Sequence, residues 1–124
     1  MPLQIKVLRL PQATVVECIG RVVFGDETTL LRSEVKKLIA ENPLVVLDFA
    51  QVRDIDSGGV GTLLAILTSA VSAGGTLKLA RINEKVRQTL SITRLLGVLR
   101  AYDTVELAVA AMPSDAKPAT GTQG

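Results

Sequence analysis

Apolar residues recur along the chain with two periods, one typical of strands and one typical of helices. Residues 4–10 alternate between apolar and polar, and residues 14–24 are rich in β-branched apolar side chains, so the two runs predict a hairpin. The alternation slips by one residue after Val7, which predicts a bulge there. At 44–49 an apolar run interrupted only by Asp48 is typical of a strand buried on both faces between parallel neighbours, and its carboxylate is expected to be hydrogen-bonded.

Helical spacing alternates with strand patterns through the rest of the chain. Gly25-Asp26 and Asn42-Pro43 flank the first predicted helix, and Gly74-Gly75 follows the second. Apolar periodicity predicts helices at about 26–41, 57–73, 83–96 and 103–112, and further strands at 76–82 and 98–101.

The order ββαβαβα(β)α predicts an α/β fold built as a single domain. Right-handed crossovers place about four helices over a mixed sheet of four to five strands, with 44–49 at its centre. The domain spans 1–112. Residues 113–124, rich in Pro, Ser, Thr, Gly and Ala, are predicted to be a disordered tail.

Composition narrows both the core and the chemistry. Apolar residues make up 48% of the 124 residues but aromatic residues only 2%, so the core must be aliphatic. The single cysteine, Cys18, excludes an intramolecular disulfide and a cysteine metal cluster, fits a reducing compartment and is expected to be a small buried strand residue. Neither a metal nor a cofactor is expected.

The charge pattern argues against nucleic acid and membrane partners. A net charge of +2, with basic and acidic residues mixed, is too small to indicate nucleic acid, and three scattered aromatics are too few for base stacking. No apolar run reaches membrane-spanning length, and the N-terminus lacks the apolar core of a signal peptide. We therefore expect a cytoplasmic protein without membrane insertion.

The quartet DSGG at 56–59 also surrounds the nucleophilic serine of trypsin-like proteases. The chain has no histidine to act as base, its lysines lie at predicted surface positions, and Ile55 occupies the place of the first glycine in the hydrolase pattern G-x-S-x-G. Phosphate-binding loops are incomplete as well, because no lysine follows Gly61 and Leu64 replaces the last glycine of G-x-G-x-x-G. An enzyme is therefore not expected.

Ser57 instead opens the helix that follows the central strand. In open α/β sheets, functional residues gather beyond the carboxyl ends of central strands. Asp56 or Ser57 is expected to cap this helix, whose free amides favour negative charge. A phosphoryl group on Ser57 would add about −1.5 to −2 of charge beside Asp54 and Asp56.

Several motifs follow one another in a characteristic order: Gly20 within the second strand, VVLDF with its Asp48, DIDSGGVGTLL at 54–64, Gly74-Gly75 before the next strand, and LLGVLRAYDTVELAVAAM at 95–112. With these motifs the chain resembles the STAS domain of bacterial anti-sigma factor antagonists from about residue 3 to 112. The resemblance implies a partner-switching protein that binds an anti-sigma factor which is also a serine kinase. It implies that the kinase ends the interaction by phosphorylating a hydroxyl residue at the start of the second helix.

One departure from the family bears on that switch. Gly58 stands where well-known members carry the modified hydroxyl, so Ser57 is the phosphorylation candidate and Thr62 lies a turn into the helix. The resemblance also leaves open a structural or regulatory subunit of a membrane transport or stress-signalling complex, without phosphorylation.

We expect the partner to bind the loop after the central strand and the exposed face of the following helix. Small residues there would let a partner's backbone come close, and Gly59→Arg is expected to weaken binding with little effect on stability. A monomer or weak dimer is expected. The predicted partner-binding residues are Arg53, Asp54, Asp56, Ser57, Gly58, Gly59, Gly61 and Thr62.

Overall fold

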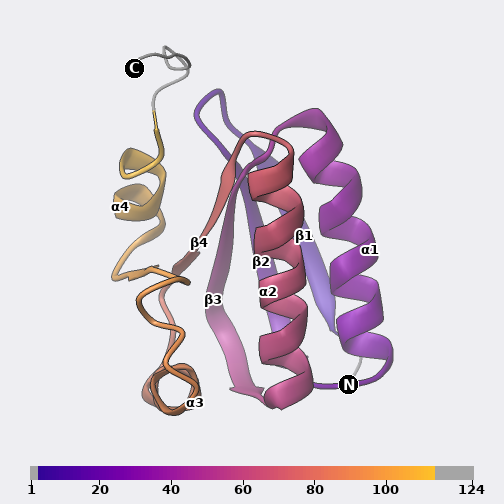
Figure 1. Ribbon diagram of the computed structural model, residues 1–124, viewed down its shortest axis with the longest axis vertical. Helices are drawn as coiled ribbons and strands as arrows, with labels where there is room; N and C mark the ends of the chain where they lie inside the picture. The colour runs from indigo at the N-terminus through magenta and orange to yellow at the C-terminus, as the bar shows by residue number, and fades with distance from the viewer. Residues whose placement is uncertain (1–2, 114–124) are drawn as a thin grey trace.

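The computed structural model describes residues 3–113 and contains nine helices and strands within that range (Figure 1). In chain order they are β1 (Gln4–Arg9), β2 (Thr14–Val22), α1 (Asp26–Glu41), β3 (Leu44–Ile55), α2 (Ser57–Ser72), β4 (Thr76–Ala80), α3 (Glu84–Ile92), β5 (Ala101–Tyr102) and α4 (Val105–Ala110). The predicted α/β class and element order are confirmed.

The five strands form one mixed sheet in the order β1-β2-β3-β4-β5. β1 pairs antiparallel with β2 as the predicted hairpin, whereas β3 lies between β2 and β4 and is parallel to both. The prediction that 44–49 is central is therefore confirmed. A central parallel strand is covered on both faces, which explains the nearly continuous apolar run from Leu44 to Phe49.

The bulge predicted after Val7 is wrong, because the register between β1 and β2 is unbroken along all of β1. Leu8 is 56% exposed on this edge strand, so the slip in alternation reflects an exposed leucine and not a shift of pairing. Register shifts occur instead between β2 and β3, between Glu17 and Ile19 and after Gly20.

β3 is longer than the sequence pattern predicts, and residues 50–55, expected as a loop, belong to the strand. Pairing with β2 continues to the Val22–Ile55 pair. Val52 and Ile55 are buried, whereas Gln51 and Arg53 are exposed, so the apolar pattern fades although the strand goes on. The candidate loop is thereby reduced to the junction between Ile55 and Ser57.

Helices cover the two faces of the sheet unequally. α1 and α2 lie side by side over one face, and the main core fills the space between them and the sheet (Figure 1). A smaller cluster packs α4 against the other face through Val15, Val46 and Ala80. Phe49 is the largest fully buried side chain of the described residues, in a core that is otherwise aliphatic, as the composition predicts.

The C-terminal elements differ most from their predicted bounds. α3 ends at Ile92 because the Leu95 N–H turns back to the Leu90 carbonyl, and the strand expected at 98–101 is displaced to β5. Thr104, and not Asp103, caps α4. Apart from Pro113, the predicted tail 113–124 lies outside the described residues. Between residues 3 and 113, no helix combines the length and apolarity needed to cross a membrane.

Candidate partner-binding site

Asp56 joins two segments that are far apart in the sequence at the point where β3 passes into α2. As the N-cap of α2, its Oδ1 accepts a hydrogen bond from the Gly59 N–H at 2.8 Å. Both of its carboxylate oxygens also lie 3.1 Å from the backbone nitrogen of Phe24, in the turn between β2 and α1. One carboxylate thus holds the starts of two helices together.

These contacts change the ionisation of Asp56. Slight desolvation acts to raise its pKa, but hydrogen bonds from the backbone N–H groups of Gly59, Phe24 and Gly58 together hold the pKa of this carboxyl below its usual range. Asp56 therefore carries a full negative charge at neutral pH. The sequence predicted either Asp56 or Ser57 as the cap of this helix, and the structure shows that the cap is Asp56.

Ser57 is the first residue of α2 and is exposed. On its α3 side, Asp54 forms an ion pair with Lys85 at 3.5 Å and accepts a hydrogen bond from the Ile55 N–H at 2.9 Å. The carbonyl of exposed Arg53 accepts a bond from the Asn83 side chain, which also caps α3. The predicted acidic loop is therefore tied to the start of α3.

The three glycines of the predicted site play different roles. Gly59 is buried, and a Cβ there would collide with the carbonyl of Val22, so the expectation that Gly59→Arg leaves stability unchanged is wrong. At Gly58 a Cβ would lie 2.5 Å from the Phe24 Cβ. Gly61 is exposed and has no atom within 4 Å of a built Cβ, so it alone is free to take a side chain.

The described residues form two hollows that open to the surface of the protein. One, of about 390 Å³, lies beside β5, and the other, of about 290 Å³, lies beside α2. The second includes Gly58, the neighbour of Ser57 in the sequence, and four residues that sequence reasoning missed, namely Phe24, Thr28, Thr29 and Arg32. It is lined by Phe24, Thr28, Thr29, Arg32, Gly58, Gly61 and Thr62. The one sequence signal for it was Phe24, an aromatic residue at the end of a strand in a chain with only three aromatics.

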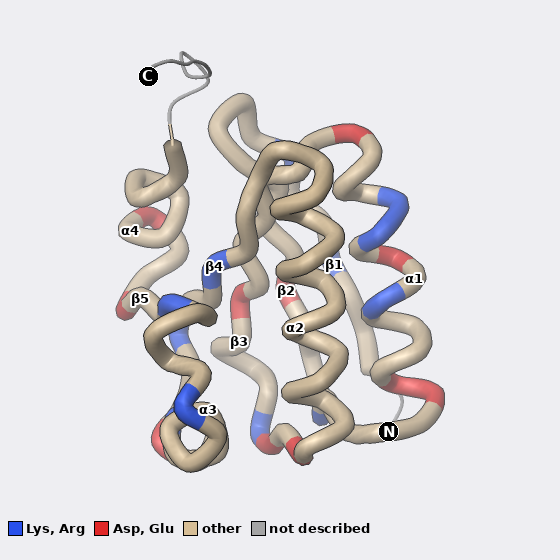
Figure 2. The backbone as a smooth tube through the Cα atoms, viewed as in Figure 1, with Lys and Arg blue, Asp and Glu red and all other residues tan. Residues whose placement is uncertain are grey.

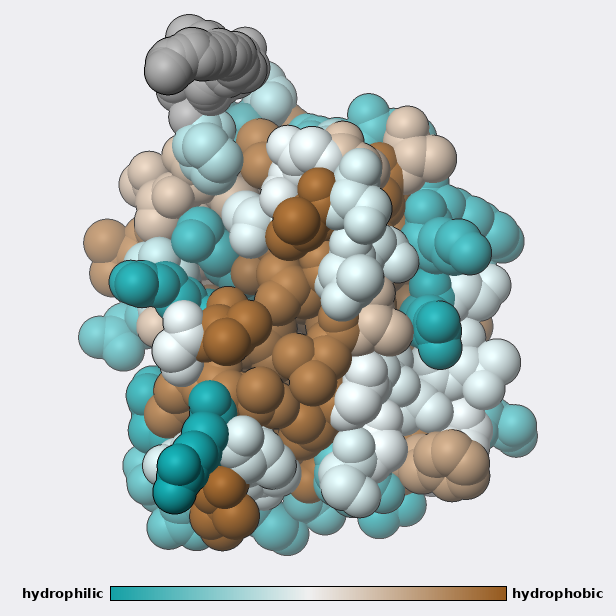
Figure 3. Space-filling model, in the orientation of Figure 1, coloured by the Kyte–Doolittle hydropathy of each residue, from teal (hydrophilic) through white to brown (hydrophobic). Residues whose placement is uncertain are grey.

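Around this end of the molecule, a charged region lies next to an apolar region of the surface. Acidic residues gather where β3 passes into α2 and in the first turn of α1, where Asp26 and Glu27 lie (Figure 2). An apolar surface runs beside α2 (Figure 3), where half-buried Leu64 and Leu67 pack against the main core. A charged end that carries both acidic and basic residues, next to an apolar flank, is suited to protein recognition.

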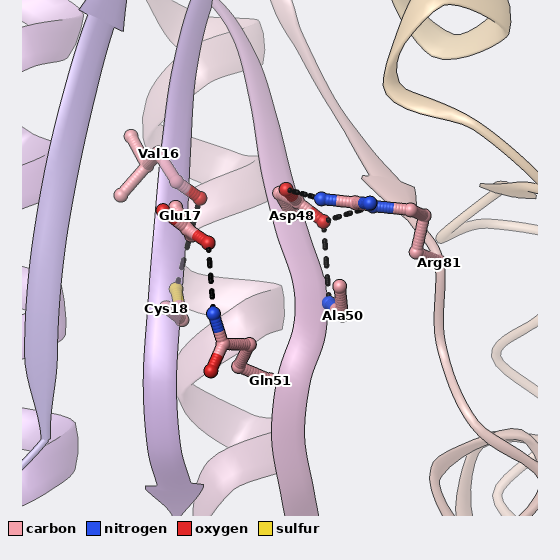
Figure 4. A network of polar contacts seen from close by, with 7 residues as sticks. All are labelled: Val16, Glu17, Cys18, Asp48, Ala50, Gln51 and Arg81. Atoms are coloured by element: carbon pink, nitrogen blue, oxygen red, sulfur yellow. Dashed lines mark hydrogen bonds and ion pairs between the residues drawn. The ribbon is translucent and has the colours of Figure 1, made fainter.

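The buried carboxylate of Asp48 lies in the same sheet but outside this site (Figure 4). Arg81 donates from Nε at 3.0 Å and from its Nη2 at 2.6 Å to the two carboxylate oxygens, and the Ala50 N–H donates at 3.2 Å. The prediction that Asp48 is hydrogen-bonded is confirmed. No group of three or more His, Cys, Asp or Glu side chains among residues 3–113 is placed to hold a metal ion.

Of the predicted site residues, the structure brings Asp56, Ser57, Gly58, Gly61 and Thr62 together around the start of α2. Arg53 and Asp54 lie on the α3 side of this start, and Gly59 lies beneath it.

The STAS domain family model matches residues 4–108, so this chain belongs to the STAS domain family. A candidate anti-sigma factor antagonist of Thermotoga maritima is 38% identical over 65 residues, which cover 52% of this chain and 58% of the relative. The match thus spans less than two thirds of that curated relative.

Solved structures extend the likeness to most of the chain. The crystal structure of a candidate anti-sigma factor antagonist from Thermotoga maritima has a TM-score of 0.79 at 25% identity, covering 86% of this chain and 92% of that one. A sulfate transporter family protein from Wolinella succinogenes has a TM-score of 0.67 at 20% identity, covering 83% and 86%, and shares the fold alone.

Proposed function

We propose that this STAS domain protein is an anti-sigma factor antagonist that works by partner switching. It binds an anti-sigma factor that is also a serine kinase, and phosphorylation of Ser57 ends the interaction. The observation that carries the proposal is that Ser57 is exposed as the first residue of α2, between the cap residue Asp56 and Gly58 in the sequence, and that Gly58 lines an open hollow.

Electrostatics supports Ser57 as the switch. The positive end of the α2 dipole tolerates a phosphate, and Asp56 continues to hold Phe24 and Gly59, so the fold need not change. The phosphate adds about −1.5 to −2 of charge beside Asp54 and Asp56. A partner that accepts the unmodified surface then meets a much more negative one.

The partner-binding surface comprises the junction of β3 and α2 with the first turns of α2. Gly59 contributes from below, because its lack of a side chain lets α2 start close against β2. The residues proposed to face the partner are Arg53, Asp54, Asp56, Ser57, Gly58, Gly61 and Thr62. The protein acts in the cytoplasm as a monomer or weak dimer, without catalysis, cofactor, nucleic acid or membrane insertion.

Gly58 favours a second candidate function. With glycine at the position where the family resemblance places the acceptor hydroxyl, the chain would serve as an unphosphorylated structural or regulatory subunit of a transport or stress-signalling complex. The shared fold of the sulfate transporter family protein is compatible with this alternative.

Capture from native lysate with the tagged full-length protein separates the two functions. Partner switching predicts recovery of a serine kinase anti-sigma factor, and incubation with that kinase and ATP should place a phosphate on the tryptic peptide 54–78, which contains Ser57. Recovery of transporter subunits, with no phosphate on this peptide, would support the second candidate instead.

A further inference from the structure

Phe24 is the most exposed aromatic side chain of the described residues, at 80%, yet it is held in place from two sides. Its backbone N–H donates to the Asp56 carboxylate, and its Cβ sits against the backbone of Gly58. A large apolar side chain on a backbone that is already fixed loses less conformational entropy on binding than one on a mobile loop. Exposed aromatic side chains on a fixed backbone are typical centres of protein interfaces.

The hollow beside Phe24 has a defined chemistry. Arg32 is its one charged lining residue, and this guanidinium forms no ion pair within residues 3–113. The Thr28 hydroxyl is engaged with the Gly25 backbone, whereas those of Thr29 and Thr62 make no hydrogen bond among the described residues. A cation with two hydroxyl donors and no carboxylate in the lining suits an acidic side chain.

We infer that Phe24 and this hollow anchor the protein partner, which lays an apolar side chain against the Phe24 ring and inserts a carboxylate beside Arg32. The inference rests on the proposed function, since the partner is the anti-sigma factor bound at the start of α2. It extends the predicted surface to the turn between β2 and α1, which the sequence motif does not include.

The anchor also gives the proposed switch a physical cause. Ser57 immediately precedes Gly58, which lines the hollow. A phosphate on Ser57 therefore places a second anion next to the partner's carboxylate. Like-charge juxtaposition at an interface is costly enough to weaken binding more than tenfold.

Isothermal titration calorimetry with the purified anti-sigma factor kinase tests the anchor. Phe24→Ala should weaken binding at least tenfold, because it removes the ring but keeps the Cβ and the N–H that touch Gly58 and Asp56. Ile92→Ala is the matched control: Ile92 is 81% exposed on α3, outside the hollow, and its loss should change affinity less than twofold.

Two charge-reversal variants on α1 test the hollow independently of Phe24. Arg32→Glu should weaken binding at least tenfold, and Lys36→Glu, one turn further along α1 and outside this hollow, less than twofold. Urea unfolding of each variant establishes that it is folded. If the wild type binds the kinase and both Phe24→Ala and Arg32→Glu bind it equally well, the anchor is overturned but the proposed function is not. If the wild type does not bind the kinase, the proposed function and the anchor are both overturned.

Discussion

Asp56 carries more of the candidate site than any other single residue. It is a helix cap, a clamp on the β2–α1 turn and a fixed negative charge beside the proposed phosphorylation site. The sequence suggested the cap but not the clamp, because Phe24 lies 32 residues away and meets Asp56 only through the pairing of β2 with β3. Such a contact has no local pattern.

The lowered pKa of Asp56 predicts a pH dependence of stability. Because the folded pKa lies below the unfolded value of about 3.9, the ionised carboxylate stabilises the fold at higher pH, and this contribution is lost as pH falls through the folded pKa. Asp56→Asn keeps a capping side chain but removes the titrating group. The urea midpoint of the wild type should exceed that of Asp56→Asn at pH 7, and the difference should shrink below about pH 4. A difference that stays constant from pH 3 to pH 7 would refute this role.

Two glycines of α2 should respond in opposite ways to the same substitution. Gly58→Ala should destabilise the protein by about 1–3 kcal/mol, because its Cβ would lie 2.5 Å from that of Phe24. Gly61→Ala, where a Cβ meets nothing within 4 Å, should stabilise it by about 0.5–1 kcal/mol through helix propensity. Chemical denaturation measures both. If Gly58→Ala is neutral, Phe24 does not fill the place of a side chain at position 58.

The glycine at 58 also shows why a family motif alone misleads. The motif places an acceptor hydroxyl there, and only the structure shows that the Phe24 turn occupies the space such a side chain would need. The same holds for Asp48: burial of a carboxylate predicted a partner, but its identity as Arg81 depends on the fold.

At the scale of elements, regular apolar patterns predicted helices and strands well, and mixed patterns did not. β3 was expected to end at Phe49, because the continuous apolar run ends there and the next residues are mostly small or polar. Its continuation follows from pairing with β2, a non-local cause. α3 was extended too far because Leu95 and Leu96 continue an apolar pattern after the helix has already turned back.

The ends of α2 and α3 share one hydrogen-bonding motif but differ in the residue that closes it. Gly74 follows α2 at φ 94°, whereas Arg94 takes the equivalent place after α3 at φ 60°, a conformation that side chains disfavour. Arg94→Gly should therefore stabilise the protein by about 0.5–1 kcal/mol. Gly74→Ala, the matched change at the end of α2, should destabilise it by about 1 kcal/mol or more. Thermal unfolding tests the pair, and two shifts of the same sign would contradict this explanation.

At the scale of the whole molecule, crossover rules and the buried central strand were enough to predict the sheet and its covering helices. They could not show that the starts of α1 and α2 converge on one surface, since this depends on how the helices pack over the sheet (Figure 1). That convergence places Phe24, Arg32 and Ser57 at the same end of the molecule.

The most direct test of partner switching compares the affinity of the purified anti-sigma factor kinase for the unmodified and for the Ser57-phosphorylated protein. Isothermal titration calorimetry measures both affinities. Ser57→Ala, which cannot be modified at this position, is the control. The account predicts that phosphorylation weakens binding at least tenfold, about 1.4 kcal/mol, while the circular dichroism spectrum is unchanged. Equal affinities for the two forms, or no phosphate on peptide 54–78 after incubation with the kinase and ATP, would contradict it.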